Sequence, residues 1–96
     1  MVVSYMRLDL VLPGARSLKD KRAILRSLID KMRHDFRVSA AEVEDHDLWR
    51  NAALGVSVVS NDAAFGRMVL QKIMETVLSN PEVEVDGSFI DDLRVP

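Results

Sequence analysis

The sequence has 96 residues, of which 48% are hydrophobic and 29% charged, a composition typical of one small globular domain rather than a disordered tail. It contains no cysteine, which excludes disulfides, thiolate metal sites and cysteine catalysis. The formal net charge is −2, but residues 1–40 carry nine Lys and Arg against four Asp, whereas residues 41–96 carry four against eleven acids.

Residues 2–12 begin the chain with a period-two alternation that predicts a strand. Its apolar face is formed by Met6, Leu8, Leu10 and Leu12. Pro13-Gly14 then breaks the pattern. Ser17, with Asp20 three residues later, is typical of a helix N-cap and predicts a helix to about residue 35.

Four further elements are predicted along the rest of the chain. They are a weak strand at 37–44, a strand at 52–59, a helix at 63–78 that starts after Ser60-Asn61-Asp62, and a last strand at 83–90. The order β-α-β-β-α-β predicts a single α+β domain over residues 1–96 with the ferredoxin-like fold. Right-handed crossovers place both helices on one face of a four-stranded antiparallel sheet of order 4-1-3-2. The predicted core contains Leu8, Leu10, Leu25, Leu28, Ile29, Val56, Val58, Ile73 and Val77.

The first predicted helix carries a row of cations beside its apolar face. At ~100° per residue, Lys19, Arg22, Arg26 and Arg33 fall within an arc of roughly 60°. Such a row is typical of phosphate contact, although solvated side chains that cover apolar surface give the same pattern. Lys21 falls inside the apolar arc, so its ammonium either extends past the end of the sheet or is held there for a ligand or an ion pair.

The loop at 13–17 leads directly into this helix. Its free N–H groups, with Arg16 and the Ser17 hydroxyl, would form an anion site, although capping alone also explains Ser17. The residues predicted to contact nucleic acid are therefore Arg16, Lys19, Lys21, Arg22, Arg26 and Arg33.

The segment 42–47 contains five potential metal ligands but no recognised ligand spacing. Strand alternation would place Glu42 and Glu44 on the same face. We expect neither a metal site nor a cofactor. Trp49, the single tryptophan, either covers a small core or stacks on a base. No catalytic triad order, zinc-protease, nucleophile-elbow, dinucleotide or P-loop motif occurs, so we expect no enzymatic activity.

The sheet face away from the helices offers a second candidate surface. Val3, Tyr5, Val11, Gly55 and Val59 would lie there and could form an interface between identical chains. An RNA-recognition sheet would need stacking aromatics where the third strand has small residues, so the helix face is favoured for RNA. A small enzyme is a third alternative, but the anion-cradling glycine–phenylalanine–arginine loop of acylphosphatases, which share this topology, is absent.

Several segments in a fixed order resemble the YlxP-like family of uncharacterised bacterial proteins. They are Ser17–Arg22, then Leu25 and Leu28, then Val38-Ser39, Ala41–Val43, Asp47–Trp49 and Val58–Asp62. The resemblance covers Met1 to Leu78, and it implies a ferredoxin-like fold with no established enzymatic activity. Some members are encoded near translation and ribosome-maturation factors, which implies a role around ribosomal RNA.

The sequence thus predicts a noncatalytic binding protein that docks on RNA or a ribosome-assembly particle through its basic helix face. The alternative is a small homo-oligomeric interaction domain that associates through its open sheet face. The apolar stretches are shorter than the ~20 residues of a membrane span, and the first residues lack the pattern of a signal peptide. We therefore expect a cytoplasmic location and no membrane partner.

Overall fold

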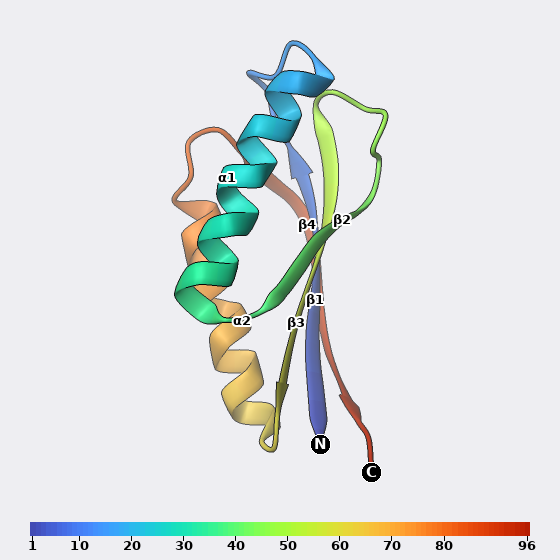
Figure 1. The fold of residues 1–96 in the computed structure, drawn as a ribbon, viewed down its shortest axis with the longest axis vertical. Helices are drawn as coiled ribbons and strands as arrows, with labels where there is room; N and C mark the ends of the chain where they lie inside the picture. Colours follow the sequence, from blue (N-terminus) through green and yellow to red (C-terminus); the bar gives the residue numbers. More distant parts are fainter.

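The computed structural model describes all 96 residues and contains the six predicted elements in the predicted order. They are β1 (Val2–Val11), α1 (Leu18–Phe36), β2 (Ser39–Glu44), β3 (Asn51–Ser60), α2 (Ala63–Leu78) and β4 (Glu84–Arg94). All neighbouring strands are antiparallel, and the sheet order is β2-β3-β1-β4. Both helices lie on the same side of the sheet, which confirms the predicted ferredoxin-like fold (Figure 1). The two termini lie at one end, opposite the start of α1 and the β2–β3 connection.

Local hydrogen bonds explain where the helices begin and end. Ser17 Oγ accepts a hydrogen bond from the N–H of Asp20 at 3.1 Å, which confirms the predicted N-cap of α1. α1 ends where Arg37 takes a left-handed conformation with φ 53° and its N–H donates to the carbonyl of Arg33. α2 begins after Asp62, whose carboxylate accepts from the N–H of Ala64 at 3.0 Å.

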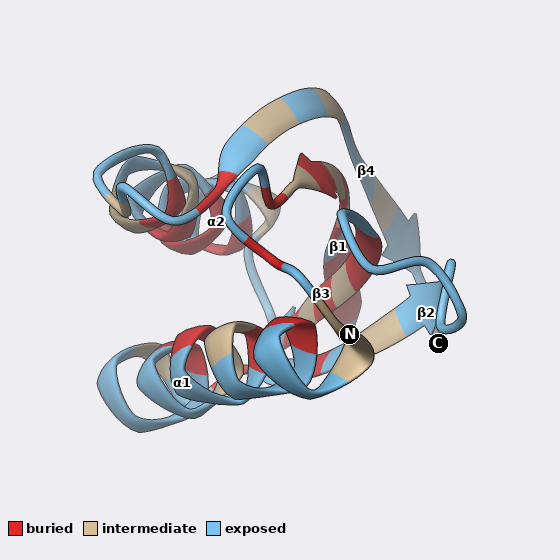
Figure 2. Cartoon of the chain, turned by 90° about the horizontal axis from the view of Figure 1, so that it is seen from above, coloured by how far each residue is buried: buried red, intermediate tan, exposed pale blue.

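One hydrophobic core lies between the helices and the sheet. It contains every residue predicted for it except Ile29, which is partly buried and packs against it. Figure 2 shows the buried residues of both helices turned towards this layer, with exposed residues on their outer sides. α2 approaches β1 closely at Gly66, where an added Cβ would lie 2.1 Å from Ser4 Oγ. Only glycine therefore allows this distance between α2 and the sheet.

The last strand is longer than predicted. β4 continues to Arg94, whereas the sequence pattern predicts its end at Ile90. Asp92 interrupts the apparent alternation because this acid points towards α2, where its carboxylate accepts from Arg67 at 2.7 Å and from Ser4 Oγ at 3.0 Å. A partly buried acid with two donors therefore occupies a position where an apolar residue would be expected.

Candidate functional site

Three cations lie free along the exposed side of α1. Lys19, Arg22 and Arg26 make no ion pair and no side-chain hydrogen bond. With Ala23 they line a hollow of about 330 Å³. Their spacing of three and four residues places them on one side of the helix over a length of about 10 Å. Their charges are therefore directed to solvent and available to an external anion.

The other predicted phosphate contacts are not equivalent to these three. The Arg33 guanidinium donates to the carbonyl of Ala40 on β2 at 2.6 Å, which ties it to the edge strand. Arg16 is exposed, and its backbone N–H donates to the Asp20 carboxylate at 3.0 Å. The carboxylate of Asp20 thus already lies at the start of α1, and Ser17 acts as its cap. The predicted anion site at this helix start is therefore unfavourable for a phosphate.

Lys21 does not belong to the nucleic-acid surface, contrary to its place among the predicted contacts. It is only 1% exposed, and its ammonium lies 2.7 Å from Glu42 Oε2 on β2. The ammonium also donates to the carbonyl of Asp45 and, at 2.8 Å, to that of Leu48. The alternative in which this lysine is held by an ion pair is the correct one, because its position in the apolar arc of α1 faces the sheet. Glu42 Oε2 is buried and has no partner besides this ion pair.

Lys21 fastens the β2–β3 connection to α1. The two carbonyls that it binds belong to this loop, in which Asp45 has a φ of 64°. Arg50 adds a further contact by donating to the carbonyl of Ala15 at 3.3 Å. Trp49 in the same loop is 53% exposed, so the interpretation that its ring covers a small core is wrong. Hydrogen bonds from Lys21 therefore fix the backbone of the loop, whereas the indole of Trp49 faces solvent.

A β-bulge separates the two glutamates that strand alternation places on one face. The register of β2 against β3 shifts between Glu42 and Glu44. Glu42 consequently points to Lys21 on the helix side, whereas Glu44 binds Arg7 at 3.1 Å on the outer side. The two carboxylates therefore cannot bind one ion together, which corrects the predicted arrangement.

The outer sheet face, which the helices do not cover, carries a broad apolar patch. Its exposed members include Tyr5, Val59, Phe89 and Leu93, with exposed fractions of 38%, 63%, 55% and 57%. The rings of Tyr5 and Phe89 lie 6.3 Å apart. Phe89 is missing from the predicted interface because a register shift between Val85 and Gly87 puts it on the face opposite Val85, although both have the same spacing in the sequence. Leu93 is missing because it lies beyond the predicted end of the strand.

The predicted interface residues divide into two groups on this face. Val3 pairs with Val59 in the strand register, and Gly55 lies two residues along β3 from the partner of Tyr5. Val11 lies at the far end of β1, where its partners are polar residues of β3 and β4. The structure thus brings four of the five residues together and leaves Val11 outside the apolar patch.

Arg7 separates the apolar part of the outer face from its acidic end. Its guanidinium contacts both Glu44 and Asp9 at 3.1 Å. The hydrogen bonds to Glu44 and Asp9 raise the pKa of Arg7 above its usual value. In return, the hydrogen bond and charge of Arg7 lower the pKa of Glu44. The single cation of the central outer face is therefore already neutralised within the chain.

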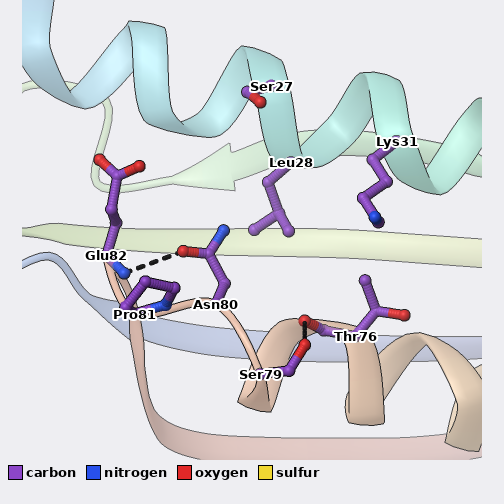
Figure 3. Close-up of a pocket in the computed structure, with 8 residues that line it drawn as sticks. All are labelled: Ser27, Leu28, Lys31, Thr76, Ser79, Asn80, Pro81 and Glu82. Carbon is purple, nitrogen blue, oxygen red and sulfur yellow. Dashed lines mark hydrogen bonds between the residues drawn. The ribbon is translucent and has the colours of Figure 1, made fainter.

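A polar cleft of about 320 Å³ lies between α1 and the C-terminal end of α2 (Figure 3). Its lining consists of Ser27, Leu28, Lys31, Thr76, Ser79, Asn80, Pro81 and Glu82. Ser79 Oγ donates to the carbonyl of Thr76 at 2.8 Å, and Asn80 Oδ1 accepts from the N–H of Glu82 at 2.9 Å. These polar groups serve to end α2 and start the following turn, and none forms a nucleophile–base pair.

Comparisons with known proteins identify related sequences and a similar fold. The model of a family described as "Protein of unknown function (DUF503)" matches residues 3–88. The "Uncharacterized protein YlxP" of Bacillus subtilis (strain 168) is 28% identical over 83 residues, which are 86% of this chain and 90% of that protein. The solution NMR structure of a de novo designed protein with a ferredoxin fold aligns with a TM-score of 0.54 at 10% identity, over 97% of this chain and 84% of that one. Neither helix has the combination of length and hydrophobicity needed to cross a membrane.

Proposed function

The chain belongs to the DUF503 family of proteins of unknown function, which confirms the resemblance to the YlxP-like family. We propose that it is a noncatalytic cytoplasmic protein that binds RNA phosphates through α1. The contacts are made by the row of Lys19, Arg22 and Arg26. Arg16 lies beyond the start of this row and Arg33 beyond its end, and both take secondary parts. The resemblance to proteins encoded near ribosome-maturation factors makes ribosomal RNA, free or in an assembly particle, the preferred partner.

The alignment of three unpaired cations on one side of α1, where they line the same hollow, is the observation that carries this proposal. Arg7, Lys21 and Arg67 are all bound to carboxylates of the same chain, but Lys19, Arg22 and Arg26 are not. Arginine donates in a planar fork that suits phosphate oxygens, and a helix presents such side chains on a rigid support. An acidic chain that leaves three aligned cations unpaired is suited to a local contact with a polyanion rather than to general nonspecific binding.

The residues that line the cleft at the end of α2 and the hollow on α1 support a noncatalytic role. The cleft at the end of α2 has polar groups that are engaged in turns, and the hollow on α1 is lined by cations and an alanine. Neither combines a nucleophile with a base at hydrogen-bond distance.

Charge reversal on the exposed side of α1 tests the proposal. Fluorescence anisotropy with labelled single-stranded RNA and with ribosomal RNA fragments should detect binding at low salt. Three phosphate contacts at ~0.7 released counterions each predict a slope of log K against log salt of about −2. The double variant Arg22→Glu/Arg26→Glu should lose this binding while its circular dichroism spectrum stays unchanged, because both side chains are exposed.

The matched control is Lys31→Glu/Lys72→Glu, which changes the net charge by the same amount at exposed lysines away from the row. This control should keep most of the affinity. Arg67 is unsuitable for that purpose because it is ion-paired with Asp92. A wild-type chain that binds no RNA at low salt, or a control as weak as the double variant, would contradict the proposal.

A further inference from the structure

We propose that the outer sheet face is the interface of a homodimer. Two copies pack face to face about a two-fold axis parallel to β1, and Phe89 of each copy enters the hollow beside Gly55 of the other. This proposal concerns the opposite side of the molecule from the basic row of α1 and is independent of RNA binding.

The apolar content of the outer face requires a covering partner. Val59, Phe89 and Leu93 are each more than half exposed, although they lie in regular strands. Strands ~4.8 Å apart and ~3.4 Å per residue give the face a projected area on the order of 500 Å². Its corrugated accessible surface is larger, which approaches the ~800 Å² that each partner buries in a standard interface. The face is therefore large enough for a stable dimer.

The shape of the outer sheet face favours a second copy of the chain as its binding partner. On the β2–β3 side there is a hollow of about 280 Å³, with Tyr5 on its β1 side and Gly55 and Ala41 in its lining. Gly55 has no side chain, and Val43, which also lines the hollow, reaches to within 3.0 Å of the place that a Cβ of Gly55 would occupy. On the β4 side, Phe89 projects into solvent. A projection and a hollow thus lie on opposite sides of β1.

In the strand register, the projecting Phe89 and the hollow at Gly55 lie at the same position along β1. Arg7 of β1 pairs with Gly55 on one side and with Phe89 on the other. A two-fold rotation about an axis along β1 exchanges the two sides and keeps the level, so Phe89 of one copy lies over Gly55 of the other. Because the operation is symmetric, this contact forms twice.

Two neighbouring rows are complementary under the same rotation. Tyr5 pairs with Ser57 and Asp91, so the Asp91 carboxylate would face a Ser57 hydroxyl that can donate to it. A third row, centred on Val3, brings Leu93 over Val59. One axis thus brings Phe89 over Gly55, Asp91 over Ser57 and Leu93 over Val59. On β1 itself the same axis brings Tyr5 over Tyr5 and Arg7, already paired with Asp9 and Glu44, over Arg7 of the other copy.

The charges of the face disfavour a nucleic acid as its occupant. Asp9, Glu44 and Asp91 lie on it, and the guanidinium of Arg7 is already shared by two of these acids. These three carboxylates outnumber the one guanidinium, so the face has a net negative charge that would repel a polyanion. The helices lie on the other side of the sheet, so a dimer formed in this way keeps both rows of α1 cations in solvent (Figure 1).

Analytical ultracentrifugation tests the dimer. The wild-type chain should sediment as a dimer at micromolar concentration, and Phe89→Glu should raise the dimer dissociation constant at least tenfold. Tyr5→Glu is a second variant at the same interface and should have the same effect. Phe65→Glu is the matched control, because this similarly exposed phenylalanine lies on α2 and should leave the dimer intact. A wild-type chain that is monomeric at high micromolar concentration would overturn the proposal.

Cross-linking tests the position of the axis. The chain has no cysteine, so a single introduced cysteine is the only reactive thiol. Sheets pack ~10 Å apart, so Val3→Cys beside the axis should be joined to its own copy by a short bis-maleimide. Ser39→Cys, two strands from β1, would lie about 22 Å from its copy, given the strand spacing of ~4.8 Å and the sheet separation of ~10 Å, and should not react. Cross-linking of Ser39→Cys but not Val3→Cys would overturn the proposed axis.

Discussion

The buried ion pair between Lys21 and Glu42 should be a main determinant of stability. In the variant Lys21→Met, the methionine keeps an unbranched apolar side chain but removes the ammonium that binds Glu42 Oε2 at 2.7 Å. That oxygen is buried and has no other partner. The carbonyls of Asp45 and Leu48 lose their donor in the same substitution. The variant therefore combines an unpaired buried carboxylate with a released loop.

The expected loss is large for a chain of this size. Removing one partner of a buried ion pair costs about 3–5 kcal/mol, because the remaining charge stays desolvated. At ~0.05–0.15 kcal/mol per residue, the free energy of unfolding of the whole chain is roughly 5–14 kcal/mol. Lys21→Met should therefore remove a substantial fraction of the total stability, which a change at an exposed lysine does not.

Urea unfolding followed by far-UV circular dichroism measures this effect. Lys31→Met is the control, since Lys31 is exposed on the same helix and has no ion pair. Its free energy of unfolding should stay within about 0.5 kcal/mol of the wild-type value. The double variant Lys21→Met/Glu42→Leu should be less destabilised than the sum of the two single variants, because it leaves no buried charge. Equal midpoints for Lys21→Met and the control, or strictly additive losses in the double variant, would refute the reasoning.

Three further predictions concern a core leucine, the contact between Gly66 of α2 and Ser4 of β1, and the ion pair between Arg67 and Asp92. Leu28→Ala should lower the free energy of unfolding by about 2–5 kcal/mol, as buried leucine truncations do, and an unchanged urea midpoint would place Leu28 outside the core. Gly66→Ala should lower the melting temperature measured by calorimetry, because its Cβ would lie 2.1 Å from Ser4 Oγ; an unchanged value would mean that α2 can move away from β1 at no cost. The hydrogen bond from Arg67, with a further one from Ser4, lowers the pKa of Asp92, so its stabilising contribution is present above the unfolded carboxyl pKa of about 3.9 and is lost as the pH falls through the folded value. Asp92→Asn should thus be less stable than the wild type near neutral pH, with a difference that shrinks in acid, and a difference independent of pH would contradict this.

Local sequence patterns were sufficient for the element order and for most of the core. The alternation in β1 and the Ser17 cap depend on neighbouring residues only, and both have the predicted form in the structure. The helical phase that places Leu25 and Leu28 in the core likewise follows from spacing within α1. The free cations Lys19, Arg22 and Arg26 were identified by the same phase. These features could be predicted because each one is fixed by interactions within a few residues of the chain.

The partners of charged side chains were decided only by tertiary structure. The sequence shows that Lys21 falls in the apolar arc, but only the packing of α1 against β2 provides Glu42 and the loop carbonyls that bind its ammonium. The bulge that turns Glu44 outward depends on the pairing of β2 with β3. The inward direction of Asp92 depends on Arg67 of α2. The register shift that brings Phe89 to the outer face depends on the pairing of β4 with β1. Lys21 and Asp92 are polar groups at positions that a pattern of hydrophobicity assigns wrongly, because the burial of each is compensated by a residue distant in the sequence.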